Sequence, residues 1–185
     1  MKTGRIAIRY AKALFDLAVE QNVLEVVHSD MDVMHKVCVS NKDFRLLLQS
    51  PIISQDKKIS VFKALFAESF NFMSFRFLEI IIKKRREVAI DEIAEEFINM
   101  YKDKHNIKTV YLKTATAPSV SLIENIKQML VKQLNANIEL VQTVIPNLIG
   151  GFVLSVDDRQ YDASVRRNIN RLKKEYHINF YESKI

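Results

Sequence analysis

Hydrophobic residues recur at spacings of three and four along roughly the first 105 residues of the chain. This is the period of α-helices that each bury one face. Ser50-Pro51 and the polar residues between the apolar runs mark the breaks. The pattern predicts helices over about 5–20, 23–39, 41–49, 54–66, 71–86 and 88–105. Ser54 is the candidate cap of the helix that ends at Phe66.

The pattern changes after residue 105. "IKTVYLKTATA" (107–117) alternates and is rich in β-branched and aromatic residues, which favours a strand. Further strands are predicted over 137–145 and 151–157, and helices over 120–134 and 163–176. The sequence therefore predicts a mainly α protein: a helical bundle in residues 1–105, followed by a smaller α/β domain in residues 106–185 with a short β-sheet and helices.

Two of the predicted helices, 5–20 and 71–86, are apolar around most of their circumference. Each has only a thin polar stripe, whereas a surface helix usually has a broad one. A helix of this kind either lies at the centre of its domain or contacts neighbours on two sides. The stripes consist of Arg5, Arg9, Lys12, Asp16 and Glu20 in the first helix, and of Asn71, Glu79 and Lys83 in the other.

Composition narrows the class of protein. The chain has 185 residues, 48% of them hydrophobic, and a formal net charge of +6, which is compatible with an acidic partner, a membrane surface or nucleic acid. Cys38 is the single cysteine, so no intramolecular disulfide can form and a reducing compartment is indicated. The N-terminus lacks a secretory signal, and the longest uncharged run (140–156) is too polar for a membrane span. We expect a soluble protein.

The adjacent glycines Gly150 and Gly151 raise the possibility of a phosphate-binding loop. Such a loop places its glycines between a strand and a helix, but here they precede a predicted strand. Close backbone approach or a bulge at the start of a strand is the better explanation. Asp157-Asp158 suits a turn, and Asp162 or its rival Ser164 suits the cap of the last helix.

A metal site is also weakly supported. His28, Asp32, His35 and Cys38 share helical spacing, but Met31, Met34 and Val37 lie between them. The run Lys83–Arg86 is more typical of a solvated helix end than of a nucleic-acid patch. No catalytic set, metal or cofactor is predicted. The last helix carries Arg166, Arg167, Arg171, Lys173 and Lys174, a basic face that favours an acidic partner.

Two stretches resemble the delta subunit of bacterial F-type ATP synthases, the family of the mitochondrial oligomycin sensitivity-conferring protein. They are "RYAKALFDLA" (9–18) and "LIGGFVLSVDDRQYDASVRRNINRL" (148–172). The second is the more specific: an apolar pair, Gly-Gly, a strand, a turn, then Asp-small-Ser-Val-Arg at the start of a helix. This chain departs from the pattern in its turn, Asp157-Asp158 instead of Gly-Asp, and at Ala163, where Gly is frequent.

The resemblance implies a non-catalytic stator subunit, one copy per complex, which resists rotor torque during proton-driven ATP synthesis. Its N-terminal six-helix bundle would bind the N-terminal helix of an alpha subunit in a groove between the first and fifth helices. Its C-terminal domain would bind the peripheral-stalk b subunits. By position, the alpha-subunit contacts are expected at Tyr10, Ala13, Leu14, Leu17, Ile81, Ile82 and Lys84, and the b-subunit contacts at Arg166, Arg167, Arg171 and Lys174.

The family motif begins close to the start of the chain, which favours a bacterial protein on the cytoplasmic face of the inner membrane over an organellar precursor. The alternative interpretation is a basic nucleic-acid-binding protein, with its last helix on phosphate. An enzyme is the third interpretation.

Overall fold

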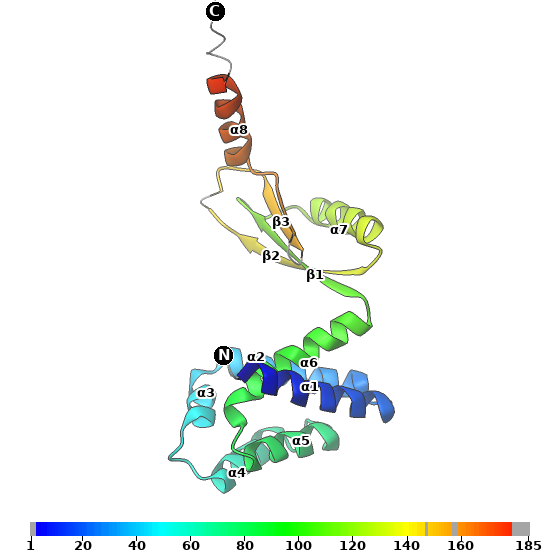
Figure 1. The fold of residues 1–185 in the computed structure, drawn as a ribbon, viewed down its shortest axis with the longest axis vertical. Helices are drawn as coiled ribbons and strands as arrows, with labels where there is room; N and C mark the ends of the chain where they lie inside the picture. The colour runs from blue at the N-terminus through cyan, green and yellow to red at the C-terminus, as the bar shows by residue number, and fades with distance from the viewer. Residues whose placement is uncertain (1–2, 147, 157–158, 179–185) are drawn as a thin grey trace, which may run out of the picture. The chain divides into compact units, whose positions relative to one another are not determined.

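A computed structural model describes residues 3–146, 148–156 and 159–178. The chain divides into two compact units, Met1–Lys104 and His105–Ile185, here called unit 1 and unit 2 (Figure 1). The protein is mainly helical with a small sheet, as the sequence predicts. The turn predicted at Asp157-Asp158 lies outside the described residues. No helix in the described ranges is long and apolar enough to cross a membrane.

Unit 1 is entirely helical over its described residues, and its boundaries lie close to those predicted. The helix predicted from residue 88 begins with a short 3-10 turn. The elements are α1 (Thr3–Glu20), α2 (Leu24–Ser40), α3 (Lys42–Gln49), α4 (Gln55–Phe66), α5 (Phe72–Lys83), the 3-10 helix η1 (Glu87–Ala89) and α6 (Ile90–Lys104).

Short polar side chains start two of these helices. The Asn41 side chain accepts a hydrogen bond from the Phe44 N–H at the start of α3, and Asn71 does the same for the Met73 N–H at the start of α5. The buried Asp30 carboxylate of α2 accepts the Asn71 N–H at 2.9 Å and so fixes the start of α5. Ser54 occupies the position before α4, but its side chain makes no capping hydrogen bond.

Helix α5 is shorter than predicted, ending at Lys83 rather than Arg86. Arg85 has a left-handed backbone conformation with φ of 56°. This lets the Arg86 N–H reach back to the Ile81 carbonyl and the Arg85 N–H reach the Ile82 carbonyl, the paired bonds of a Schellman motif. The charges at 84–86 therefore lie on a turn beyond the helix.

The core of unit 1 forms where α6 packs against both α1 and α2. The buried face of α1 is mostly small, which allows the backbones of α1 and α6 to approach closely. The face of α6 that completes this core carries large apolar side chains. The buried residues are Ala7, Ala11, Leu14 and Ala18 on α1, and Ile90, Ile93, Ala94 and Phe97 on α6.

Unit 2 contains a four-stranded sheet, within the described residues, in the order β2-β1-β3-β4. The strands β1 and β2 are parallel and are joined by α7, while β3 pairs antiparallel with both β1 and β4. The short strand β4 adds to the three strands identified from the sequence. The elements are β1 (Ile107–Thr114), α7 (Val120–Leu134), β2 (Asn137–Val144), β3 (Phe152–Val156), β4 (Arg159–Asp162) and α8 (Val165–Ile178).

Alternation along β1 explains which face of this sheet is buried. Val110 and Leu112 are inaccessible, whereas Tyr111 between them is half exposed. The buried side packs with Ile126 and Leu130 of α7, which lies over the sheet (Figure 1). Unit 2 therefore has a separate core of its own.

Candidate functional site

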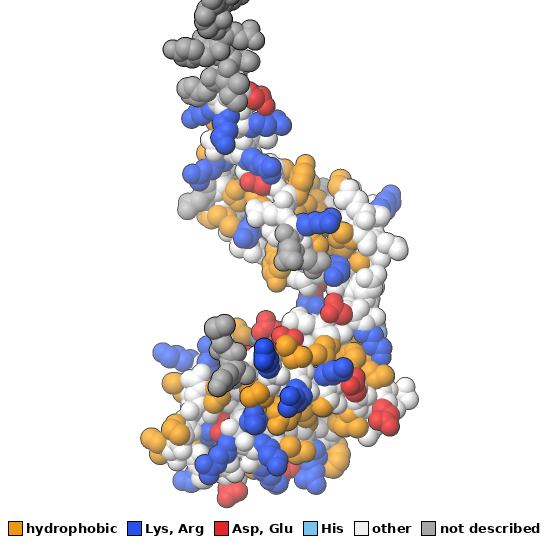
Figure 2. Space-filling view, viewed as in Figure 1, with side chains coloured by type: hydrophobic (Ala, Val, Ile, Leu, Met, Phe, Trp, Pro, Cys, Tyr) orange, Lys and Arg blue, Asp and Glu red, His pale blue; other side chains and the backbone are white. Residues whose placement is uncertain are grey.

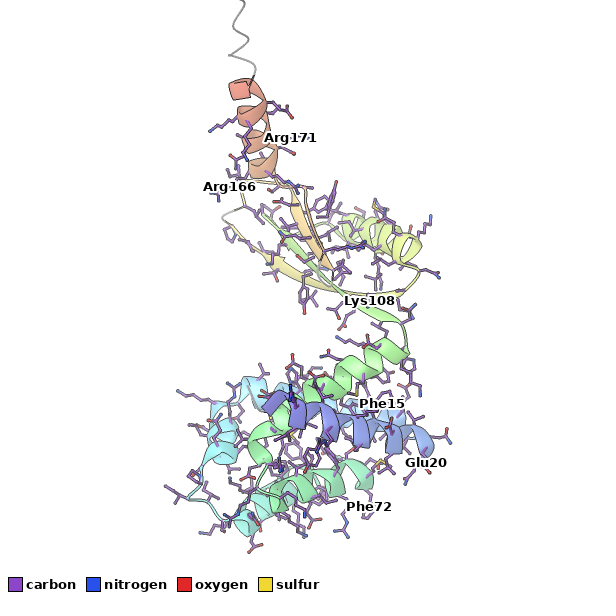
Figure 3. The ribbon with its side chains drawn as sticks, viewed as in Figure 1. Phe15, Glu20, Phe72, Lys108, Arg166 and Arg171 are labelled. Atoms are coloured by element: carbon purple, nitrogen blue, oxygen red, sulfur yellow. The ribbon has the colours of Figure 1, made fainter. Side chains whose placement is uncertain are left out.

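The two over-apolar helices of the sequence, α1 and α5, lie beside each other in unit 1. The rings of Tyr10 and Phe77 meet edge to face with centroids 6.5 Å apart. Glu20, at the end of α1, and Phe72, at the start of α5, lie at the same end of the unit, so the helices run in opposite directions (Figure 3).

Both helices expose apolar side chains at helical spacing along this side. On α1, Leu17 is 41% exposed and Tyr10 is partly exposed; on α5, Ile80 is 51% exposed. Apolar side chains lie among basic ones on the visible face of unit 1 (Figure 2). We call the following set the α1–α5 stripe: Tyr10, Ala13 and Leu17 of α1, and Met73, Phe77 and Ile80 of α5.

Three expected alpha-subunit contacts are core residues. Leu14 is 1% exposed, and Ile81 and Ile82 are fully buried. In this fold their side chains fill the interior of unit 1 and are not available to a partner. Those expected contacts must therefore be corrected, while Tyr10, Ala13, Leu17 and Lys84 remain at the surface.

Sequence reasoning missed Met73, Phe77 and Ile80. These residues are spaced by four and three, and Lys84 continues the same row. The sequence does not distinguish this exposed row from the core row of α5, because the core row, which contains Leu78, Ile81 and Ile82, is equally apolar.

The Glu79 carboxylate of α5 is paired with two basic side chains of the same helix. Glu79 accepts hydrogen bonds from Arg76 and Lys83, each at 2.8 Å. These two bonds lower the pKa of Glu79 from 4.5 to about 2, and the bond from Lys83 has the larger effect. Arg76 and Lys83 are thus engaged by a side chain of their own helix.

Glu79→Gln should remove a pH-dependent part of the stability of unit 1. Because the pKa of Glu79 is lowered on folding, its stabilisation is present above pH 4.5 and disappears as the pH falls toward 2. The wild-type protein should therefore exceed the variant in free energy of unfolding at pH 6, and the difference should vanish near pH 2. Urea titrations across this range measure it, with Asp103→Asn as an exposed control; a difference that stays constant with pH would contradict the assignment.

The second candidate surface is α8 in unit 2. Its apolar residues Val165, Ile169 and Leu172 are between 38% and 47% exposed, so the stripe that normally packs into a core is largely solvent-accessible here. Basic side chains cover the helix (Figure 2). The expected b-subunit contacts Arg166, Arg167, Arg171 and Lys174 are all exposed. The side chain of Tyr176, which continues the apolar row, lies outside the described residues.

The Gly-Gly motif anchors the start of α8. The N–H of Val165 donates to the Gly150 carbonyl at 3.0 Å, and the N–H of Ala163 donates to the Phe152 carbonyl at 2.9 Å. A Cβ on Gly151 would lie 2.3 Å from the Ala163 carbonyl oxygen, and φ at Gly151 is 80°. Close backbone approach, rather than phosphate binding, thus explains this glycine.

Ser164 and Asp162 divide the capping role between them. The Ser164 hydroxyl accepts the Arg167 N–H at 3.2 Å, so Ser164 is the cap of α8. Asp162, two residues before Ser164 at the end of β4, accepts the Ser164 N–H at 2.8 Å. Its hydrogen bonds with Ser164 lower the pKa of the Asp162 carboxyl.

The side chains of His28, Asp32 and His35, which share helical spacing with Cys38, make other contacts. His28 stacks on Tyr101 with ring centroids 3.7 Å apart, and His35 Nδ1 lies 3.0 Å from the carboxylate oxygen Oδ1 of Asp91. Asp32 pairs with Lys36 on the same helix. No group of three potential ligand side chains is found in the part of the chain that the structure describes.

Cys38 should be an unreactive thiol in the folded protein. It is 1% exposed, and burial, reinforced by the negative charge of Asp91, raises its pKa from 9.0 to about 12. At pH 8 its thiolate fraction is then about 1,000-fold below that of an ordinary thiol. Iodoacetamide should label the native protein at least that much more slowly than the urea-unfolded protein; comparable rates in both would contradict this assignment.

Comparisons with known proteins agree over nearly the whole chain. The family model described as ATP synthase delta (OSCP) subunit matches residues 6–176. The ATP synthase subunit delta of Cytophaga hutchinsonii is 34% identical over 95% of this chain and 96% of its own, and that of Christiangramia forsetii is 34% identical over the full length of both.

A solved structure shows the same fold. A chain of the Toxoplasma gondii mitochondrial ATP synthase hexamer superposes with a TM-score of 0.74, at 23% identity, over 92% of this chain and 96% of that one. Since the family model and both bacterial relatives span almost all of the sequence, the chain belongs to the ATP synthase delta (OSCP) subunit family.

Proposed function

We propose that this protein connects the catalytic head of an F-type ATP synthase to the b subunits, with unit 1 on the head and unit 2 on the stalk. Its family makes it a peripheral-stalk subunit of the synthase, structural and not itself catalytic. In that position it holds the head still against the torque of the rotor. The comparisons give no support to the nucleic-acid-binding alternative.

We propose that unit 1, whose described residues form the helices α1 to α6, corresponds to the six-helix bundle that the resemblance implies, and that the α1–α5 stripe is its surface for the N-terminal helix of an alpha subunit. The observation that carries this proposal is the pair of neighbouring helices that each bury one apolar face and expose another. An amphipathic helix laid along the stripe would cover the rings of Tyr10 and Phe77 and the side chain of Leu17.

In this proposal, the b subunits bind unit 2 through α8. Val165, Ile169 and Leu172 would supply the apolar contact, and the basic residues beside them would pair with acidic side chains of the stalk. We further propose one copy per complex. As a subunit of a membrane-bound complex, the protein is also proposed to lie on the cytoplasmic face of the bacterial membrane.

Binding of an alpha-subunit N-terminal peptide to the full chain tests the proposal. Leu17→Asp and Ile80→Asp should each weaken binding at least about tenfold, because each places a charge within the buried apolar contact. Leu65→Asp is the matched control, since Leu65 of α4 is 55% exposed and lies outside the stripe. Isothermal titration measures the affinities; equal losses in all three variants, or no binding by the wild-type chain, would overturn the assignment.

A further inference from the structure

The α1–α5 stripe has opposite charges at its two ends. At the end where α5 finishes, Lys84 and Arg86 are exposed, and the Arg86 guanidinium lies 5.9 Å from the centre of the Tyr10 ring. Arg9 is exposed on the adjoining turn of α1. We call Arg9, Lys84 and Arg86 the basic end.

The other end of the stripe is acidic. Asp16 and Glu20 are exposed on the last turns of α1, at the end where α5 begins (Figure 3). The basic residue on the adjacent turn of α5, Arg76, is engaged by Glu79 and also lies over the Phe72 ring at 5.5 Å. Asp16 and Glu20 make no ion pair within residues 3–146 as the structure describes them.

The charges of the basic end are equally uncompensated within the protein. Glu79, the acidic side chain on this part of α5, is occupied by Arg76 and Lys83. Among the described residues, Arg9, Lys84 and Arg86 form no ion pair, although Arg86 contacts the Tyr10 ring. These three cations therefore remain available to a partner beside an apolar surface.

Apolar contact alone fixes neither the direction nor the register of a helix on such a stripe, because hydrophobic attraction is non-directional. Charges that pair in one orientation and repel in the other add that information. Because the stripe excludes water on one side of each pair, the attraction is screened less than between isolated surface charges.

We propose that the charge difference along the stripe orients the bound segment, with acidic side chains of that segment over Arg9, Lys84 and Arg86 and its less acidic end beside Asp16 and Glu20. This inference rests on the proposed function of the stripe as the alpha-subunit site. The basic end then selects direction, and the apolar stripe supplies most of the affinity.

The test uses the full chain and a synthetic peptide of the alpha subunit's N-terminal segment from the same synthase. Lys84→Glu/Arg86→Glu should weaken binding about tenfold at low salt, and by less at high salt. A peptide whose acidic residues are changed to lysine should bind this variant better than it binds the wild-type chain. Lys57→Glu/Lys63→Glu on α4 is the control, since it changes the net charge by the same amount.

Direction is measured with a nitroxide on either end of the peptide. The label at the more acidic end should broaden the amide resonances of residues near Arg86, and the label at the other end those near Glu20. Peptide binding that ignores Lys84→Glu/Arg86→Glu, equal weakening by the α4 control, or broadening at both ends from one label would overturn the inference and leave the proposed function intact. No binding by the wild-type chain would overturn both.

Discussion

Lys58→Met is expected to lower the free energy of unfolding of unit 1 by about 3–5 kcal/mol. The Lys58 side chain is 2% exposed, and its ammonium group donates to Glu87 Oε1 at 2.7 Å and to the Leu48 carbonyl at 2.9 Å. Methionine would fill similar space but leave the Glu87 carboxylate buried without a counter-ion. Glu87 Oε2 already has no hydrogen-bond partner among the described residues, so no second donor compensates.

The double variant Lys58→Met/Glu87→Met separates loss of the pair from loss of one partner. Replacing both charges with apolar side chains removes the uncompensated carboxylate, so it should recover much of the stability. Lys57→Met, at the exposed neighbouring position, should change stability by less than about 0.5 kcal/mol. Urea unfolding with hydrogen exchange resolved to unit 1 measures all three; a Lys58→Met protein as stable as Lys57→Met would contradict this role.

The pair also has a consequence for the α1–α5 stripe. Glu87 directly follows Arg86, and the bond to Lys58 ties the turn after α5 to α4 and to the end of α3. The basic end of the stripe is therefore held by a buried ion pair. In conditions where the Lys58→Met chain is still folded, its affinity for the alpha-subunit peptide should fall as well.

Much of this fold follows from local pattern. The 3.6-residue period located the helices of unit 1 because each buries one face, and the alternation after residue 105 located β1 because its Val110 and Leu112 face a core while Tyr111 does not. The early end of α5 was not predictable in the same way, since Arg85 in a left-handed conformation carries no glycine or asparagine signal.

The site was harder to predict than the fold. The helical period does not distinguish the interior apolar face of α1 from the exposed one, so the sequence predicts Leu14 at the partner surface although it is buried. The spacing of Ala7, Ala11 and Ala18 carried the missing signal, because small residues mark where helices approach most closely. The pairing of Lys58 with Glu87, 29 residues away, depends on tertiary structure that no local pattern encodes.

Gly151→Ala is expected to destabilise unit 2 by at least about 3 kcal/mol. Two independent effects combine at this position. Alanine disfavours the φ of 80°, and its Cβ would lie 2.3 Å from the Ala163 carbonyl oxygen, a backbone atom that cannot rotate away. Relief would require β3 to separate from the start of α8, which would break the Val165-to-Gly150 and Ala163-to-Phe152 hydrogen bonds.

The other two glycines, Gly4 and Gly150, serve as controls for this prediction. A Cβ on Gly150 would lie 3.0 Å from a Val165 methyl, so Gly150→Ala should lower the free energy of unfolding by about 1 kcal/mol. Nothing lies within 4 Å of a Cβ on Gly4, so Gly4→Ala in helix α1 should be neutral or slightly stabilising. Hydrogen exchange resolved to each unit measures the three effects, and only the Gly151→Ala protein should lose most protection in unit 2. Because that loss would unseat α8, binding to the b subunits should fall while alpha-peptide binding by unit 1 persists. Equal protection in the two alanine variants of the Gly-Gly pair would show that backbone contact at Gly151 does not hold α8 in place.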